Sequence, residues 1–66
     1  MTIQLNGKIE SIAEGTSVSA LLALKSIVPA HVVVEKNSVI VARDAYPITI
    51  LNTGDTLELL RFVGGG

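Results

Sequence analysis

The chain has 66 residues, a formal net charge of −1 and no cysteine. This length allows one domain, and the lack of cysteine excludes a disulfide framework and a thiolate metal site. The five basic residues are spread along the chain, which argues against a nucleic-acid partner. No basic stretch followed by an apolar run opens the sequence, and its apolar runs are far shorter than the ~20 residues of a membrane span. We therefore expect a cytoplasmic protein without a membrane partner.

The composition is unusually apolar for so small a chain, because 48% of the residues are hydrophobic. A domain of this size has little interior in which to bury them. Some of this apolar surface is expected to stay exposed, which favours protein partners.

The first half of the chain predicts a hairpin and a helix. Residues 2–5 alternate polar and apolar, residues 8–12 form the returning strand, and Asn6-Gly7 between them suits a type I′ turn. Thr16 or Ser17 can cap a helix, whose apolar stripe continues to residue 28. Pro29 should end this helix near Val28, because the residue before a proline avoids the α region.

The second half predicts strands joined by turns. Residues 32–35 read as a central strand because the three valines at 32–34 are β-branched, and residues 39–41 form a short strand after a turn at 36–38. Residues 43–47 read as irregular, and residues 48–50 suggest another short strand. Residues 52–55 have the composition of a turn, and the last strand follows at residues 56–62.

A hairpin, one helix and further strands predict an α+β fold in which the helix lies across one face of a mixed sheet. If the first and last strands pair in the centre, the architecture is a β-grasp, the ubiquitin-like fold. The domain would span residues 1–62, and residues 63–66 would form a flexible glycine tail. In the last strand, the period of two places Leu57 and Leu59 toward the helix. Glu58, Leu60 and Phe62 then face away, and we expect Leu60 and Phe62 to help form an apolar docking patch.

The chain closes with Phe62-Val63-Gly64-Gly65-Gly66. Glycine lets another backbone or a narrow channel approach closely. Residues 63–66, when extended, could carry the carboxylate of Gly66 about 13 Å from the folded body. Such an arm suits insertion into the active site of another protein, although glycine-rich ends are also common as inert linkers.

Other candidate sites are weaker, and the sequence predicts no metal or cofactor. His31 stands alone without a spaced set of metal ligands, so a surface role is expected. Ser17 and Ser19 have no base arranged nearby, which favours helix capping over nucleophilic catalysis. Asp55 more readily supports its turn than forms an acid–base pair with Glu58.

Several segments together resemble the ThiS family, the sulfur carriers of thiamine biosynthesis. The resemblance covers essentially the whole chain in order. It rests on Leu5-Asn6-Gly7-Lys8, Leu21-Leu22, Val34-Glu35-Lys36-Asn37, Val41-Ala42-Arg43, Gly54-Asp55-Thr56-Leu57-Glu58 and the ending Phe62-Val63-Gly64-Gly65-Gly66.

This resemblance implies a carrier protein without catalytic activity of its own. The carboxylate of Gly66 would be adenylated by ATP and magnesium in an E1-like adenylating enzyme. A persulfide sulfur donor, such as a cysteine desulfurase, would convert the adenylate to a thiocarboxylate, and thiazole synthase would take the sulfur. Leu60, Phe62, Val63, Gly64 and Gly65 would contact these partners.

Three alternatives remain at this point. The small subunit of molybdopterin synthase also ends in two glycines, although that family is usually longer. A ubiquitin-like modifier would use the same activation but pass Gly66 to a lysine. A simple interaction module would carry an inert tail.

Overall fold

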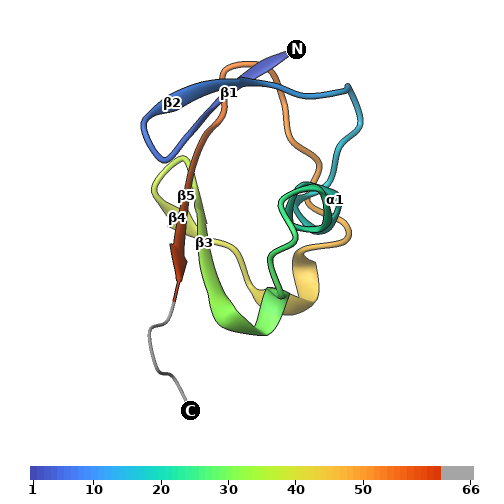
Figure 1. Ribbon diagram of the computed structural model, residues 1–66, viewed down its shortest axis with the longest axis vertical. Helices are drawn as coiled ribbons and strands as arrows, with labels where there is room; N and C mark the ends of the chain where they lie inside the picture. The colour runs from blue at the N-terminus through green and yellow to red at the C-terminus, as the bar shows by residue number, and fades with distance from the viewer. Residues whose placement is uncertain (62–66) are drawn as a thin grey trace.

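The computed structural model describes residues 1–61, and its strands form one five-stranded sheet in the order β2-β1-β5-β3-β4 (Figure 1). One α-helix and two short 3₁₀ helices are the other elements within residues 1–61. The elements are β1 (Thr2–Leu5), β2 (Lys8–Ser11), α1 (Val18–Leu24), η1 (Pro29–His31), β3 (Val32–Lys36), β4 (Val39–Ile40), η2 (Arg43–Ala45) and β5 (Thr56–Arg61).

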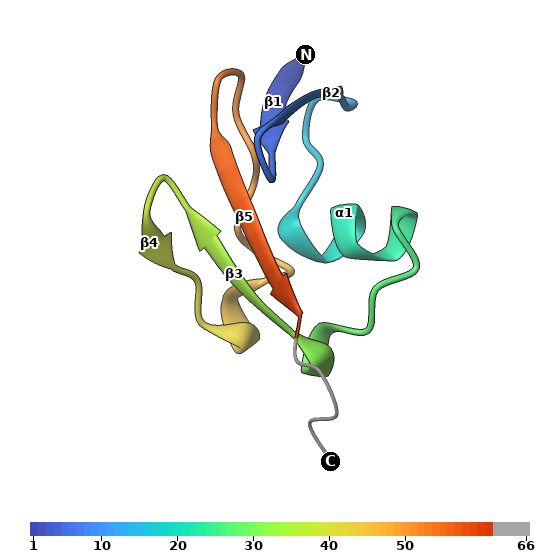
Figure 2. The same cartoon turned by 60° about the vertical axis from the view of Figure 1, so that its left-hand side comes forward.

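The first and last strands pair in the centre of the sheet, as predicted. β1 runs parallel to β5, whereas β2 is antiparallel to β1 and β3 is antiparallel to β5. The sheet is therefore mixed, and β5 has a neighbour on each side. Figure 2 shows α1 beside one face of this sheet. None of the described elements covers the opposite face.

Both hairpins turn where the sequence predicts, and the type I′ turn expected at Asn6-Gly7 is confirmed. Asn6 and Gly7, between β1 and β2, have φ angles of 48° and 82°. Asn37 and Ser38, between β3 and β4, have φ angles of 53° and 70°. Two consecutive residues with positive φ are typical of a type I′ turn, whose twist matches the flanking strands. β4 is shorter than predicted, because Val41 lies beyond its end.

The helix begins as predicted and ends earlier than predicted. Ser17 is the N-cap, since its hydroxyl accepts a hydrogen bond of 3.0 Å from the amide of Ala20. α1 ends at Leu24, so the prediction that it reaches Val28 is wrong. Ser26 takes a positive φ of 57°, and the amides of Ser26 and Ile27 donate to the carbonyls of Ala23 and Leu22. This is the Schellman pattern of helix termination.

The prediction of a strand at residues 48–50 is also wrong. The amides of Ile48 and Thr49 both donate to the carbonyl of Ala45, which continues the turn that begins in η2. Ile50 makes only an isolated bridge to Ser17. The isoleucines that suggested a half-buried strand are in fact exposed, Ile48 by 77% and Ile50 by 45%.

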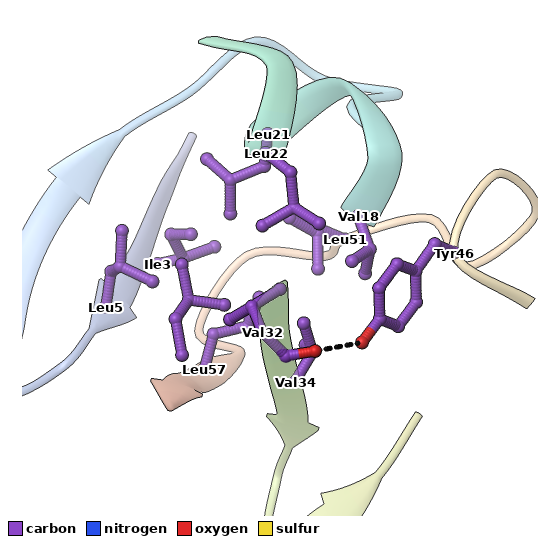
Figure 3. Packing of buried hydrophobic residues seen from close by; sticks show 11 residues of the cluster. Ile3, Leu5, Val18, Leu21, Leu22, Val32, Val34, Tyr46, Leu51 and Leu57 are labelled. Atoms are coloured by element: carbon purple, nitrogen blue, oxygen red, sulfur yellow. Dashed lines mark hydrogen bonds between the residues drawn. The ribbon is translucent and has the colours of Figure 1, made fainter. Parts of the chain in front are cut away.

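The core lies between α1 and the sheet and contains side chains from both (Figure 3). Val18, Leu21 and Leu22 of α1 point toward Ile3 and Leu57 of the central strands. Tyr46 is buried beside them, and its hydroxyl donates to the carbonyl of Val32 at 3.3 Å. No helix within residues 1–61 is long and apolar enough to cross a membrane.

Candidate functional site

β5 leads toward the C-terminal segment, and its two faces differ as the sequence predicts. Leu57 and Leu59 are buried, with 0% and 8% of their surface exposed, whereas Leu60 is 50% exposed on the other face. Glu58 is exposed on the same face as Leu60. The other predicted site residues, which are Phe62, Val63, Gly64, Gly65 and Gly66, lie outside the described residues.

The start of β5 is attached to the β3–β4 turn by the side chain of Asn37. Its Oδ1 accepts a hydrogen bond of 2.9 Å from the amide of Thr56, and its Nδ2 donates to Oδ1 of Asp55 at 3.0 Å. The backbone amide of Asn37 also donates to the carbonyl of Thr56 at 2.8 Å. The turn residue thus fixes the point at which β5 enters the sheet.

The middle of β5 is attached to the β1–β2 turn by the side chain of Asn6. The register pairs β1 with β5 only as far as Leu5 and Leu57, and the backbone amide of Asn6 then donates to the carbonyl of Leu57. Oδ1 of Asn6 accepts a hydrogen bond of 2.7 Å from the amide of Leu59. An asparagine side chain therefore continues the ladder where β1 has ended.

Asp55 supports the turn before β5, which confirms the structural role expected for it. Its Oδ2 accepts a hydrogen bond of 2.8 Å from the amide of Asn52, and Nζ of Lys36 lies 3.9 Å away. Burial raises the pKa of Asp55, but the hydrogen bonds from Asn52 and Asn37 and the charge of Lys36 outweigh it and lower the pKa overall. The carboxylate is thus ionised at neutral pH and acts as an acceptor, not as a catalytic acid.

A shallow groove runs beside the end of β5 on the side of β1. It is lined by Leu5, Asn6, Lys25, Ile27, Leu59 and Arg61. The ammonium of Lys25 forms an ion pair with Glu10. The groove beside the end of β5 thus combines apolar side chains with the basic Lys25 and Arg61.

His31 and Ser17 have the structural roles expected from the sequence. His31 is exposed at the end of η1, and residues 1–61 contain no group of three acidic, histidine or cysteine side chains that could hold a metal ion. Ser17 caps α1. Ser19 lies inside α1 and is not its cap, so the capping role expected for it is wrong.

The sequence reasoning missed the roles of Asn6 and Asn37 in holding β5. Both were assigned to turns, and the positive φ of each supports that assignment. The signal that could have found them is the short polar side chain itself, because asparagine in a turn can bond to a neighbouring backbone.

Comparison with known proteins agrees with this geometry. The model of the ThiS family matches residues 3–66. A crystal structure of the thiamine biosynthesis protein ThiS from Geobacter metallireducens superposes with a TM-score of 0.83, at 39% identity and with both chains fully covered. A solution structure of a thiamine biosynthesis protein from the same organism has a TM-score of 0.82 and 35% identity, covering all of this chain and 88% of that one.

Two curated relatives are longer. Proteins named thiazole synthase from Magnetococcus marinus and Paramagnetospirillum magneticum are 36% and 35% identical to this chain over all 66 residues. The chain spans about a fifth of their length, since 20% of each is covered.

The mixed sheet with parallel β1 and β5 in its centre and one helix across one face defines a β-grasp, or ubiquitin-like, protein. Within that class, the chain belongs to the ThiS family, the family of sulfur carriers that its sequence resembles.

Proposed function

We propose that this chain is the sulfur carrier for thiazole formation in thiamine biosynthesis, and that the carboxylate of Gly66 carries the sulfur. The observation that supports this most directly is the match to the ThiS family, which extends through residue 66. The attachment of β5 at both Thr56 and Leu59 supports it as well, because a fixed strand gives the following segment a defined starting point.

Activation begins with the carboxylate, which is ionised at neutral pH because a terminal carboxyl has a pKa of about 3.3–3.7. One of its oxygens attacks the α-phosphorus of ATP. The bond from the α-phosphorus to the bridging oxygen breaks, and pyrophosphate leaves. The resulting acyl adenylate has a good leaving group, which the free carboxylate lacks.

Sulfur transfer follows in two steps. The outer sulfur of a protein persulfide attacks the acyl carbon, AMP leaves, and an acyl disulfide joins the two proteins. A thiol then reduces the sulfur–sulfur bond, which releases the thiocarboxylate and leaves a disulfide on the donor side. This chain has no cysteine, so both the persulfide and the reducing thiol must come from partners.

The role of this chain is that of a co-substrate. Gly64, Gly65 and Gly66 have no side chains to obstruct a narrow channel, and Leu60, Phe62 and Val63 would contact the partner that receives them. We propose an E1-like adenylating enzyme, a persulfide donor and thiazole synthase as partners. The names of the longer relatives support thiazole synthase. Cytoplasmic location stays a prediction.

The test is an intact-mass measurement. The purified protein must first have the mass of a chain that ends at Gly66. Incubation with the adenylating enzyme, MgATP and a persulfide donor should then replace one oxygen by sulfur and add about 16 Da. Covalent adducts with other proteins would instead indicate a ubiquitin-like modifier. An unchanged mass in a complete reaction would contradict the carrier function.

A further inference from the structure

The sheet face opposite α1 carries two carboxylates on neighbouring strands. Glu35 of β3 and Glu58 of β5 are direct cross-strand partners. Each alternates with buried residues, such as Val34 and Leu57, so both side chains lie on the face away from α1. Directly opposite residues have Cβ atoms about 4.5–5.5 Å apart. Neither glutamate belongs to an ion pair within residues 1–61.

This arrangement is unfavourable in the free protein. Like charges directly opposite each other destabilise an antiparallel pair of strands. A cation between the two carboxylates would replace the repulsion with charge-assisted hydrogen bonds, which are stronger than neutral ones. The pair is thus better suited to a bound state than to the isolated fold.

Apolar residues flank the two carboxylates on β4 and toward the C-terminal end of β5, whereas the polar Thr56 precedes Glu58 on the same face. The next cross-strand pair is Val33 with Leu60, and Ile40 is the partner of Glu35 on β4. Leu60 is 50% exposed and Ile40 is 65% exposed. Apolar side chains next to the pair exclude water on binding, and polar contacts beside them are strengthened by the lower local dielectric.

These properties indicate which side chain of a partner protein would bind between the two carboxylates. A guanidinium is planar, weakly hydrated and able to donate to two carboxylates, and it also packs against apolar surface. An ammonium is more strongly hydrated and donates from a single point. The carboxylate pair beside exposed apolar side chains therefore fits an arginine.

We propose that an open-face patch, formed by Val33, Glu35, Ile40, Glu58 and Leu60, docks onto thiazole synthase with an arginine of the synthase between Glu35 and Glu58. The choice of thiazole synthase rests on the proposed function. It is also supported by the two relatives of that name, in which a segment similar to this chain belongs to a longer polypeptide. Leu60 adjoins the last described residue of β5, so docking here would hold the body of the carrier close to the origin of its tail.

The experiment is a calorimetric titration of the full chain into thiazole synthase from the same organism. Glu35→Gln and Glu58→Gln should each weaken binding about tenfold, because an isosteric amide removes the charge that the guanidinium contacts. Glu58→Asp keeps the charge and should retain more affinity than Glu58→Gln. The matched control is Glu14→Gln, which removes one negative charge from an exposed position in the turn before α1.

A second readout separates docking from folding. The glutamine variants should unfold at the same temperature as the parent or at a higher one, since each relieves the repulsion between the two carboxylates. Weaker binding together with unreduced stability supports the proposal. Affinity equal to that of the parent, or an equal loss in Glu14→Gln, would overturn it.

The identity of the docking partner and the proposed carrier function are tested by different measurements. Loss of binding to the adenylating enzyme with unchanged binding to thiazole synthase would also overturn the proposal, because the partner would be wrong. Formation of the thiocarboxylate on Gly66 does not require thiazole synthase. Its mass measurement on the parent chain therefore decides the carrier function independently of the docking result.

Discussion

The side chain of Asn6 is hydrogen-bonded to the backbone of Leu59, 53 residues further along the chain. Its Oδ1 accepts from the amide of Leu59 at 2.7 Å, and its Nδ2 lies 3.5 Å from the carbonyl oxygen of the same residue. A turn at one end of the sequence thereby holds the strand that leads to the other end. These two contacts of Asn6 should therefore contribute to the stability of the fold.

Asn6→Gly should lower the free energy of unfolding by about 1 kcal/mol, because it removes the bond to Leu59 while keeping the positive φ accessible. Asn6→Ala should lower the free energy of unfolding by about 1 kcal/mol more than Asn6→Gly, since a positive φ is strained for alanine. Urea denaturation measures both. Asn52→Ala, at an exposed position, serves as the control and should stay within about 0.5 kcal/mol of the parent. Equal stability of Asn6→Gly and the parent would contradict the role of this bond.

Asp55 should make stability depend on pH. Its folded-state pKa is lowered from 3.8, so its contribution is fully present well above pH 3.8 and is lost as the pH falls through that value to the folded-state pKa. Asp55→Asn should cost about 2 kcal/mol at pH 7, because charged acceptors make the stronger hydrogen bonds. The difference between parent and variant should shrink in urea titrations below pH 3.8. A difference that is constant with pH would contradict this account.

Leu59 and Leu60 are adjacent in sequence and lie on opposite faces of β5, so they form a matched pair. Leu59→Ala should lower the free energy of unfolding by about 2–5 kcal/mol, because it creates a cavity in the core. Leu60→Asn should change it by less than about 0.5 kcal/mol and should weaken partner binding. Thermal denaturation and a binding titration measure the two effects. Strong destabilisation by Leu60→Asn with unaltered binding would show that this side chain belongs to the fold.

An alanine added after Gly66 should abolish formation of the thiocarboxylate, because the reacting carboxylate would no longer belong to glycine or lie at the same distance from the body. The melting temperature should not change, since the addition follows the last strand. Intact mass after the activation reaction is the measurement. An alanine added before Met1 is the control and should leave the reaction unaffected. Full activation of the C-terminally extended protein would exclude the proposed geometry.

Local sequence determined the elements whose chemistry is local. The Asn6-Gly7 turn, the cap at Ser17 and the alternation of Leu57, Glu58 and Leu59 are all as predicted, because backbone preference and side-chain period act over a few residues. The central pairing of β1 with β5, which was the condition for a β-grasp, is observed in the structure. The family resemblance that rests on these segments is confirmed across residues 3–66.

Tertiary structure decided the features that depend on distant neighbours. α1 ends at Leu24 because Ser26 accepts a positive φ, which is uncommon for serine, while Ile27 packs against the core. The segment after η2 turns instead of forming the predicted strand, because the amides of Ile48 and Thr49 donate to the carbonyl of Ala45. The bonds of Asn6 and Asn37 to β5, and the facing of Glu35 and Glu58, depend on strand register. Register is fixed only when the whole core is buried, so these contacts could not be derived from any short stretch of sequence.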